Sequence, residues 1–382
     1  MPDVVVVGAG VIGAACAEAL SAAGVDVTVI DRGTPAGGTT ASGEGNVLVS
    51  DKEPGAELTL ALASRREFGI VLARLPEQVA DVEWEDKGGL VVATGDPAPL
   101  EKFAATQREA GVDARVISPA EAFELEPLLT RAVTTGVYYP DDAQVQPVLL
   151  ATALLAAVRR RGGEVRSGVA ALGVRQEAGR VTGVETDAGV IACDAVVNAC
   201  GPWAGAFAAA AGGPIEILPR RGMILVTAPL PESVRHKVYD ADYVGAVGSG
   251  DADLQTSTVV ESTKAGTVLI GSSRERIGFD ESVKVHVLRE LARKAVGIFP
   301  FLADVPVMRT YGGFRPYAPD HLPVIGPDPR VQGLWHATGH EGAGIGLAPA
   351  TGRLLTELFI GVPPHLDPEP FRVDRPAVVG VS

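Results

Sequence analysis

The sequence has few cysteines: 382 residues contain only Cys16, Cys193 and Cys200. No two of them have the short spacing of a metal-binding pair, and three cysteines do not form a disulfide framework. No metal site is therefore predicted. Each cysteine is expected to be a small buried residue, and the protein is expected to belong to a reducing compartment, the cytoplasm.

Long apolar runs and an excess of positive charge are also missing. The longest apolar stretch, near Val148 to Val158, is too short to cross a bilayer. The start Met1-Pro2-Asp3 lacks the basic region of a secretory signal. A net charge of −14 repels phosphate backbones, so nucleic acid is not an expected partner.

Glycine, in contrast, is abundant. Many of the 46 glycines fall in short clusters between apolar runs, as in nucleotide-binding α/β proteins. The hydrophobic share of 46% and the charged share of 21% are ordinary for a globular enzyme. The length is sufficient for two domains.

The first glycine cluster follows a β-branched run. Val4 to Val7 predicts a buried parallel strand, and Gly8 to Gly13 follows at once with the spacing GxGxxG. Ala14 to Ala23 predicts a helix, and Val25 to Ile30 predicts a second strand that ends at Asp31. This order of strand, glycine loop, helix, strand and acid predicts dinucleotide binding.

Each glycine of this loop has an expected task. Gly8 makes the tight turn, Gly10 lets the main chain approach a pyrophosphate, and Gly13 lets the helix pack on the strand. The helix start offers N–H groups to the phosphates, and Asp31 accepts hydrogen bonds from ribose hydroxyls. The loop does not distinguish FAD from NAD. The residues predicted to bind the cofactor here are Gly8, Gly10, Val11, Ile12, Gly13, Asp31 and Arg32.

Two later strands also run into glycine turns. Asp194 to Ala199 predicts a buried strand that ends at Gly201, with a helix over about 204–211. Leu334 to Gly339 predicts a short strand, and the loop from His340 to Gly346 leads into a helix from about Leu347 to Ile360. A second glycine loop at a helix start exceeds what a nicotinamide needs, but it would stabilise the negative charge of a reduced flavin.

Taken in order, these motifs resemble the D-amino acid oxidase superfamily, in the branch of glycine, sarcosine and D-amino acid oxidases and dehydrogenases. Within that branch, Gly43-Glu44-Gly45-Asn46 and Gly339 to Ile345 are most similar to the flavin subunits of opine, hydroxyproline and proline dehydrogenases and of hydrogen cyanide synthase. The resemblance covers nearly the whole chain. It rests on Gly8 to Gly13 with Asp31, Gly38 to Ser42, Val197 to Ala204, Gly312 to Pro316, Thr338 to Gly346 and Ala348 to Gly352.

The resemblance implies where FAD would lie. Gly38 to Ser42 would meet the pyrophosphate and ribityl chain, and Glu44 to Leu48 the isoalloxazine ring. Val169 would meet the adenine through its main chain, Gly201 and Trp203 would flank the cofactor, and Gly342 to Leu347 would meet the pyrimidine edge. The cofactor-binding residues implied in this way are Thr39, Thr40, Ala41, Ser42, Gly45, Asn46, Val169, Ala199, Gly201, Trp203, Gly342, Ala343, Gly344, Ile345 and Gly346.

The cofactor is expected to be non-covalent. In the monomeric sarcosine oxidases a cysteine of the C-terminal loop holds the FAD, but no cysteine follows Cys200 here. A histidine tether near the N-terminal loop is excluded as well, because no histidine precedes His236.

The predicted catalytic residues are Arg315, Tyr317, Glu341 and Asn46. In relatives an arginine of the Arg315 motif binds the substrate carboxylate, which a planar guanidinium matches with two hydrogen bonds. The alternative is a structural arginine paired with an internal acid. Glu341 stands where glycine oxidases often have a second arginine. It would attract an amine or a second polar group, or it would cap the following helix, and it argues against plain glycine as the substrate.

Tyrosines and one loop complete the substrate side. Tyr239, Tyr243 and Tyr311 are expected either to line the pocket or to lie in the core. Asp240 to Asp253, rich in glycine and aspartate, predicts a loop near the mouth of the site that could act as a lid.

The expected reaction is oxidation of the C–N bond of a small amino acid or secondary amine, with hydride transfer to flavin N5. The imine product would hydrolyse to an oxo acid. Glycine, sarcosine, a D-amino acid and a proline-like amine are candidate substrates, and no general base is assigned because orientation does most of the work.

Several alternatives stay open. The electrons could pass to oxygen, or to a partner subunit if the chain is the flavin subunit of an opine- or hydroxyproline-type dehydrogenase. An NAD(P)H-dependent flavin hydroxylase and a non-enzymatic FAD-binding subunit are the other classes. The sequence leaves the oligomeric state open, homo- or hetero-oligomer.

The expected fold class is α/β, with a Rossmann-type FAD domain and a second, mostly antiparallel β-sheet domain for the substrate. The FAD domain is expected to be discontinuous, over 1–82, 141–216 and 315–382. The substrate domain is expected over 83–140 and 217–314. Strands of the second domain are predicted at 89–93, 217–227, 256–262, 267–271 and 305–310.

Overall fold

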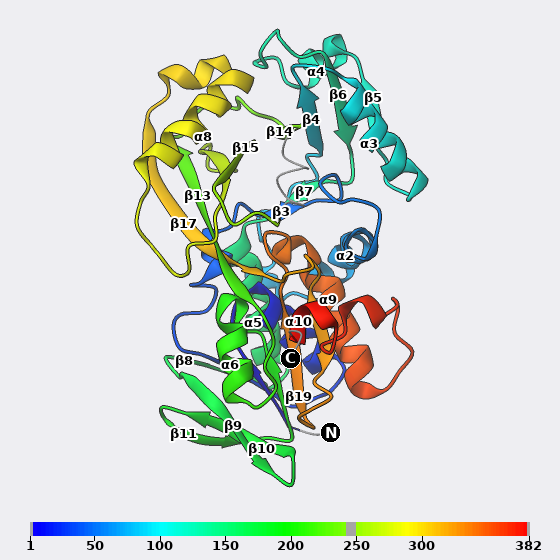
Figure 1. Cartoon of the computed structure of the whole chain (residues 1–382), viewed down its shortest axis with the longest axis vertical. Coiled ribbons are helices and arrows are strands. Elements are labelled where there is room, and N and C mark those ends of the chain that lie inside the picture. The colour runs from blue at the N-terminus through cyan, green and yellow to red at the C-terminus, as the bar shows by residue number, and fades with distance from the viewer. Residues whose placement is uncertain (1–2, 242–249, 380–382) are drawn as a thin grey trace.

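The structure is a computed structural model that describes residues 3–241 and 250–379. Two bodies are visible in Figure 1. The lower one is built on a mainly parallel sheet with both chain ends beside it, and the upper one on a larger sheet. This arrangement confirms the predicted fold class.

The lower sheet has six strands in the order β18-β19-β12-β1-β2-β8. The strands β1, β2, β8, β12 and β19 run parallel, and β18 is antiparallel to β19. Such an order places the ends of β1 and β12 side by side, where a ligand binds in open α/β sheets. The strands are β1 Val4–Val7, β2 Val27–Asp31, β8 Glu164–Ser167, β12 Ala195–Asn198, β18 Val324–Pro327 and β19 Leu334–Thr338.

Helices cover one face of this sheet, and a small antiparallel sheet with a short helix covers the other. The main core joins α1, α2, α5 and α9, and a second cluster joins β9 and β10 to β1 and α6. The helices are α1 Val11–Ala22, α2 Ala56–Ala73, α5 Pro147–Arg160, α6 Ala204–Ala210, α9 Gly344–Ile360 and α10 Pro376–Val379. The small sheet has β9 Ala171–Glu177, β10 Arg180–Thr186 and β11 Gly189–Ala192.

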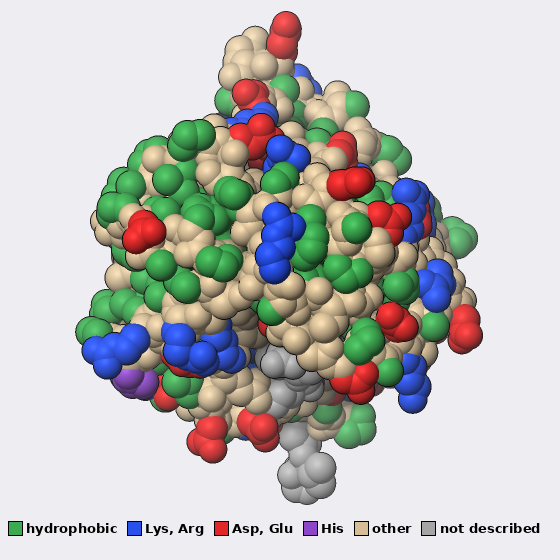
Figure 2. Space-filling view, turned by 90° about the horizontal axis from the view of Figure 1, so that it is seen from above, with side chains coloured by type: hydrophobic (Ala, Val, Ile, Leu, Met, Phe, Trp, Pro, Cys, Tyr) green, Lys and Arg blue, Asp and Glu red, His purple; other side chains and the backbone are tan. Residues whose placement is uncertain are grey.

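The upper sheet has eight strands in the order β17-β13-β16-β15-β14-β4-β6-β5, antiparallel except for the β14–β4 pair. Helices α3 Ala98–Glu109, α4 Pro119–Leu125 and α8 Val285–Ile298 accompany it (Figure 1). From above, hydrophobic side chains gather on one side of the surface between charged ones (Figure 2). The strands are β4 Gly89–Ala93, β5 Arg115–Ile117, β6 Thr135–Tyr139, β13 Leu218–Thr227, β14 Lys237–Asp240, β15 Gln255–Ser262, β16 Val268–Arg274 and β17 Val307–Tyr317.

Two elements differ from the prediction in ways that affect the site. Strand β17 continues through Gly312 and Gly313 to Tyr317, so the expected domain boundary between 314 and 315 falls inside a strand. The glycines let another segment approach, since a Cβ on Gly313 would lie 2.4 Å from the Cβ of Ser42. Helix α9 begins at Gly344 rather than near Leu347, so its first turn includes part of the predicted glycine loop.

Short elements were missed. Strands β5, β6, β14 and β18 were not predicted, because runs of three to five residues carry little periodicity. The strands β3 Asn46–Val47 and β7 Ala143–Gln144 form a two-stranded pair near the junction of the two bodies. The predicted lid falls largely on residues 242–249, outside the described residues. Within the described ranges, no helix is long and apolar enough to cross a membrane.

Asp142 holds the chain segment that follows β3. Its Oδ1 accepts hydrogen bonds from the main-chain N–H of Val49 at 2.9 Å and of Ser50 at 3.3 Å. Its Oδ2 contacts the Ser50 hydroxyl, and Tyr239 reaches the same hydroxyl. Burial raises the pKa of Asp142 to about 7, and the hydrogen bonds from Ser50 and Val49 act in the opposite direction.

This pKa predicts how stability depends on pH. An unfolded aspartate titrates at about pH 4, so between that pH and about 7 the folded protein binds up to one proton more than the unfolded chain. The stabilisation from Asp142 is complete below the unfolded pKa and is lost as pH rises through about 7. In D142N, the free energy of unfolding relative to wild type should therefore rise by up to about 1.4 kcal/mol per pH unit between about pH 5 and pH 7.

Urea unfolding of FAD-saturated protein across this pH range measures the effect. D141N is the matched control, because it removes the neighbouring carboxylate on the same turn. Parallel pH profiles for wild type and D142N would contradict the raised pKa.

Candidate active site

A cavity of about 660 Å³ connects the first glycine loop with the upper sheet. Its wall comes from the loop after β1, the segment 31–46, the end of β12, strands β13, β16 and β17, and the loop before α9. Segments far apart in the sequence therefore share one space. A volume of this size is typical of ligand and cofactor sites.

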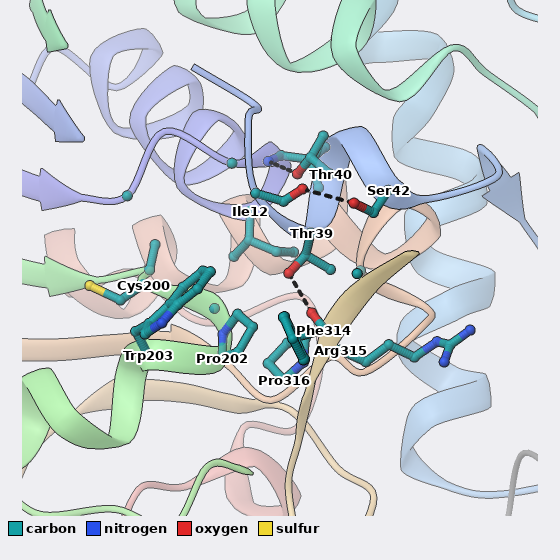
Figure 3. Close-up of a pocket in the computed structure, with 18 of the residues that line it drawn as sticks. Ile12, Thr39, Thr40, Ser42, Cys200, Pro202, Trp203, Phe314, Arg315 and Pro316 are labelled. Atoms are coloured by element: carbon teal, nitrogen blue, oxygen red, sulfur yellow. Dashed lines mark hydrogen bonds between the residues drawn. The ribbon is translucent and has the colours of Figure 1, made fainter. Parts of the chain in front are cut away.

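The glycine loop forms the floor of this cavity. Gly8 has φ +110°, a conformation that favours glycine, and a Cβ there would lie 2.3 Å from the carbonyl oxygen of Ala199. Gly10 has ordinary extended backbone, and a Cβ on it would meet only the Thr40 hydroxyl, at 3.3 Å. The main chain at Gly10 is therefore open to a ligand. The N–H of Val11, at the start of α1, donates to the Thr40 hydroxyl at 3.0 Å (Figure 3).

Asp31 ends β2 at the cavity wall. Its two carboxylate oxygens accept from the N–H of Ala9 at 2.7 Å and of Gly33 at 2.8 Å. These bonds hold the carboxylate beside the glycine loop, where it can accept hydrogen bonds from ribose hydroxyls. The guanidinium of Arg32 stacks on the Trp203 ring, with 4.1 Å from Cζ to the ring centroid, so both line the same part of the cavity.

A short 3₁₀ turn, Thr39–Ser42, contacts strand β17. The Thr39 hydroxyl donates to the carbonyl oxygen of Phe314 at 2.6 Å, and the Ser42 hydroxyl lies 3.4 Å from the carbonyl oxygen of Gly312. Figure 3 shows Thr39 and Phe314 facing each other, with Arg315 next along the strand. This contact ties the strand that carries Arg315 to the cofactor side of the cavity.

Helix α9 begins at the opposite wall. Gly342, Gly344 and Ile345 line the cavity, and the first turn of α9 contains no acidic residue that would offset its positive dipole. His340 is buried there, and its Nε2 lies 3.0 Å from the Thr351 hydroxyl. Burial lowers the pKa of His340 to about 3, so this histidine is neutral. Its Nδ1 has no hydrogen-bond partner among the described residues.

Arg315 lines the upper wall and crosses strand β13 at Gly222. A Cβ on Gly222 would lie 2.3 Å from Nη1 of Arg315, so a side chain at this position would displace the guanidinium. Nη1 donates to the carbonyl oxygen of Ser273 at 2.8 Å. This hydrogen bond to a main-chain acceptor on β16 helps to orient the guanidinium at the cavity.

Glu341 also lines the cavity, and its carboxylate binds basic side chains. One oxygen lies 3.1 Å from Nη1 of Arg220, and the other lies 2.8 Å from Nδ1 of His321. The hydrogen bond that His321 donates to Glu341 raises the pKa of His321, while burial acts against it. Helix α9 has no side-chain cap, so Glu341 does not cap it. The negative charge of Glu341 instead neutralises the guanidinium of Arg220, which has 0% exposure.

Asn46 lies at another wall of the cavity, in a line of buried polar groups. Its amide donates to Glu44 at 3.3 Å, and its carbonyl oxygen contacts the ammonium of Lys237. Lys237 in turn lies 2.9 Å from Glu261. Burial raises the pKa of Glu261, and Lys237 works in the opposite direction. Glu44, like Asn46, lines the cavity, so this network presents two polar side chains to it.

Most of the predicted residues come together at this cavity, and the structure places the others behind its lining. Gly13 packs on Gly8, Gly45 on Val145, and Gly346 on the main chain of β3. Tyr317 lies edge-on to His321, with the Arg220 guanidinium 5.5 Å from its ring centroid. Ala41 and Ala343 also lie outside the lining. The predicted lining residues are Gly8, Gly10, Val11, Ile12, Asp31, Arg32, Thr39, Thr40, Ser42, Asn46, Val169, Ala199, Gly201, Trp203, Arg315, Glu341, Gly342, Gly344 and Ile345.

The remaining aromatic and sulfur side chains have clear positions. Tyr239 is fully buried, and neither it nor Tyr311 belongs to the lining, whereas Tyr243 lies outside the described residues. Cys16 and Cys193 are buried as predicted. Cys200 is half-buried and lines the cavity, and burial raises the pKa of its thiol to about 12.

Sequence reasoning missed four basic residues at or behind the upper wall, of which Arg274 lines the cavity. Arg220, Arg274, Lys237 and His321 were not singled out. Three of them belong to strands of the upper sheet and are almost fully buried. A usable signal was present at the start of β13, where two arginines precede a run of apolar residues. In an alternating strand, one of two adjacent arginines must face inward.

Comparison with known proteins identifies the family of this chain. The family of FAD-dependent oxidoreductases known as DAO matches residues 3–358. The chain is 31% identical to the hydrogen cyanide synthase subunit HcnC of Pseudomonas aeruginosa, covering 100% of this chain and 98% of that protein. It is 29% identical to the bifunctional protein ThiO/ThiG of a Nostoc species, but spans only 52% of that protein's length.

Solved structures of two oxidases share the fold of this chain. The glycine oxidase of Geobacillus kaustophilus superposes with a TM-score of 0.89 at 26% identity, covering 98% of each chain. The iminodiacetate oxidase of Chelativorans sp. BNC1 superposes with a TM-score of 0.83 at 26% identity, covering 97% of this chain and 98% of the other.

The residues at the cavity fit FAD. The open main chain at Gly10, the carboxylate of Asp31 and the starts of α1 and α9 supply what a pyrophosphate, a ribose and the pyrimidine edge of a flavin need. The chain belongs to the DAO family of FAD-dependent oxidoreductases. It is an FAD-dependent enzyme that oxidises an amine or amino acid.

Two glycine variants separate packing from cofactor binding. G10A should change the free energy of unfolding of the apoprotein by less than about 1 kcal/mol, because its backbone suits alanine and the added Cβ would press on one side-chain atom, the Thr40 hydroxyl at 3.3 Å. The added methyl should weaken FAD binding about tenfold or more, since it stands where the pyrophosphate approaches. G13A should instead destabilise the apoprotein by about 2 kcal/mol or more, because its Cβ would lie 1.9 Å from the carbonyl oxygen of Gly8.

Urea unfolding of apoprotein and fluorescence titration with FAD measure the two effects. Unchanged FAD affinity in G10A would show that the pyrophosphate lies elsewhere.

Proposed function

We propose that the enzyme oxidises the C–N bond of a small amino acid or secondary amine to an imine, with Arg315 binding the substrate carboxylate. The imine then hydrolyses to an oxo acid, or persists if it is cyclic. When bound, FAD supplies the acceptor for the hydride. The cofactor is proposed to be non-covalent.

The observation that carries this proposal is the position of Arg315. Its guanidinium lines the same cavity as the glycine loop and the start of α9, and the space for it exists because residue 222 is glycine. A planar guanidinium in a cavity of this kind binds a carboxylate through two hydrogen bonds. The proteins that resemble this chain include a glycine oxidase and an iminodiacetate oxidase, both named for carboxylate-bearing amines.

The work of the chain in this reaction is mainly to orient the substrate. Arg315 fixes the carboxylate, and the walls at Asn46 and Ile345 limit how the amine can turn. The amine must give up its proton before or as the C–H bond breaks. Apolar side chains such as Ile12, Ile224 and Ile345 line much of the cavity, which favours a neutral amine over an ammonium ion. Positioning of this kind can account for most of the rate enhancement.

A second candidate function differs from the first in its electron acceptor. HcnC, which matches this chain over its whole length, is named as a subunit of hydrogen cyanide synthase. This likeness supports a flavin subunit that passes electrons to a partner chain, as an alternative to an oxidase that uses oxygen. A cytoplasmic location is proposed on the basis of the three cysteines, none of which is in a disulfide.

The reaction is tested by mixing the purified protein, without oxygen, with sarcosine, glycine, D- and L-proline, hydroxyproline isomers, D-alanine and an opine. At least one amine should bleach the visible flavin band. R315K should raise the amine concentration needed for half-reduction about 10- to 100-fold, because lysine keeps the charge but loses the two-point hydrogen bonding. R309K, at an exposed position of the same strand, is the matched control and should behave as wild type.

Admission of air then distinguishes the two acceptors. Fast return of the flavin colour identifies an oxidase, and slow return a dehydrogenase that needs a partner. An FAD-loaded protein that no amine bleaches would argue against the proposed reaction.

A further inference from the structure

Three acidic side chains line the cavity within the described ranges, and two of them have partners for both carboxylate oxygens. Asp31 accepts hydrogen bonds from two main-chain N–H groups, and Glu341 lies against Arg220 and His321. Glu44 is the third acid. It is 8% exposed, and its Oε1 has no hydrogen-bond partner among the described residues. A carboxylate oxygen at this depth is unfavourable unless a ligand donates to it.

The other oxygen of Glu44 is held by a buried network. Lys237 contacts the side-chain carbonyl oxygen of Asn46 and lies 2.9 Å from Glu261. Because that contact fixes which end of the Asn46 amide faces Lys237, the NH2 end faces Glu44 and donates to Oε2 at 3.3 Å. The network therefore orients the carboxylate and leaves Oε1 without a partner.

A glycine of β16 makes room for this carboxylate. A Cβ on Gly271 would lie 2.3 Å from Oε1 of Glu44, so a side chain there would displace the carboxylate. Two residues further along β16, the carbonyl oxygen of Ser273 accepts the hydrogen bond from Arg315. Two residues of chain span at most about 7 Å. The carboxylate of Glu44 and the guanidinium of Arg315 thus lie against the same short stretch of β16, and both line the cavity.

We infer that Glu44 binds the ammonium group of the substrate and accepts the proton that the nitrogen must lose. This inference rests on the proposed function and adds a catalytic residue to it. In an α-amino acid, the carboxylate and the nitrogen are bonded to the same carbon. Arg315 can therefore hold the carboxylate while Glu44 holds the nitrogen, whether or not the nitrogen carries a substituent.

Proton transfer to Glu44 precedes the loss of hydride. One N–H bond of the ammonium breaks as an O–H bond forms on the carboxylate, so a cation and an anion become two neutral groups. Burial among apolar side chains favours this neutral pair over the ion pair. The hydride then leaves the carbon for the flavin, and the nitrogen lone pair forms the C=N bond. The proton on Glu44 passes to water after the product has left.

Other titratable and charged groups lie near Glu44 or line the same cavity. They are Lys237, Glu261, Arg274, Tyr311, Arg315, His340 and Glu341. Burial, and then the charges of Glu44 and Glu261, raise the pKa of the Tyr311 hydroxyl, so it stays protonated. All of these groups are present in wild type and in variants of residue 44. A difference in pH dependence between those proteins therefore reports on residue 44.

The pH dependence of flavin reduction without oxygen tests this role, with the amine of the panel above that bleaches the flavin fastest. Between about pH 7 and pH 9 an alkyl ammonium keeps its proton, because it titrates at about pH 10. In wild type, Glu44 removes that proton, so the second-order rate constant should vary by less than about threefold. E44Q reacts only with amine that is already neutral. Its rate constant should be about 100-fold or more below wild type at about pH 7 and rise about tenfold per pH unit.

E44D and E341Q are the matched controls. E44D keeps a carboxylate at this position and should keep the level pH profile at a lower rate. E341Q removes the other acid that has basic partners at the cavity, and its profile should also stay level. A slope in E341Q together with a level profile in E44Q would overturn the assignment to Glu44.

Binding of unreactive acids gives a readout that does not depend on turnover. α-Aminoisobutyrate has no hydrogen on its α-carbon, and pivalate carries a methyl group in place of the ammonium group. The wild-type holoenzyme should bind α-aminoisobutyrate about tenfold or more tightly than pivalate, as measured by the change in the flavin spectrum. E44Q should lose this preference, whereas R315K should weaken the binding of both acids. Equal binding of the two acids by wild type would overturn the inference, whether or not E44Q holds flavin.

The outcomes separate the inference from the proposed function. If an amine bleaches the flavin and E44Q has the same rate constant and pH profile as wild type, the role of Glu44 is wrong while amine oxidation stands. If no amine bleaches the flavin, but wild type prefers α-aminoisobutyrate to pivalate and E44Q does not, the proposed reaction is wrong while the ammonium site at Glu44 stands.

Discussion

The contact between the turn Thr39–Ser42 and strand β17 holds the two halves of the site together. Thr39 donates to the carbonyl oxygen of Phe314, and Ser42 packs against Gly313 so closely that no Cβ fits there. The turn belongs to the cofactor-binding half, and β17 is an edge strand of the upper sheet. A second contact supports it, because the N–H of Glu341 donates to the carbonyl oxygen of Pro316 at 3.1 Å and so ties the residue after Arg315 to the loop before α9.

The strands of the upper sheet place positive charge at and behind the upper wall of the cavity. The sheet brings Arg220, Arg274 and Arg315 onto neighbouring strands, and a buried guanidinium needs either an acid or strong hydrogen bonding. Glu341, in the loop before α9, is the acid for Arg220, and its other carboxylate oxygen contacts His321. The loop that begins α9 therefore has two roles. It presents a helix start to the cofactor, and it neutralises part of the wall opposite.

Local sequence patterns predicted much of the fold. The GxGxxG loop, the strands around it and the glycine turn after β12 are set by short-range rules, since a tight turn, a close helix and a buried strand each require particular residue types in a row. Strand β17 was predicted too short, because Gly312 and Gly313 have low strand propensity. Glycine is needed there because Ser42, 270 residues away from Gly312 in the chain, packs against the strand. The short strands β5, β6 and β14 had too few residues for a periodic signal.

The sequence alone determined the class of the protein and its cofactor, because both depend on residues that are neighbours in the chain or on a resemblance to an entire family. The role of Arg315 in binding a carboxylate stays a prediction. Only the tertiary structure decided which charges meet. Glu341 could be assigned as a helix cap or a substrate ligand from sequence, and it is in fact the partner of Arg220 and His321. Arg315 reaches the carbonyl oxygen of Ser273 across β13 because residue 222, over which its guanidinium lies, is glycine. Pairing across strands depends on register and on distances between segments, and neither is encoded locally.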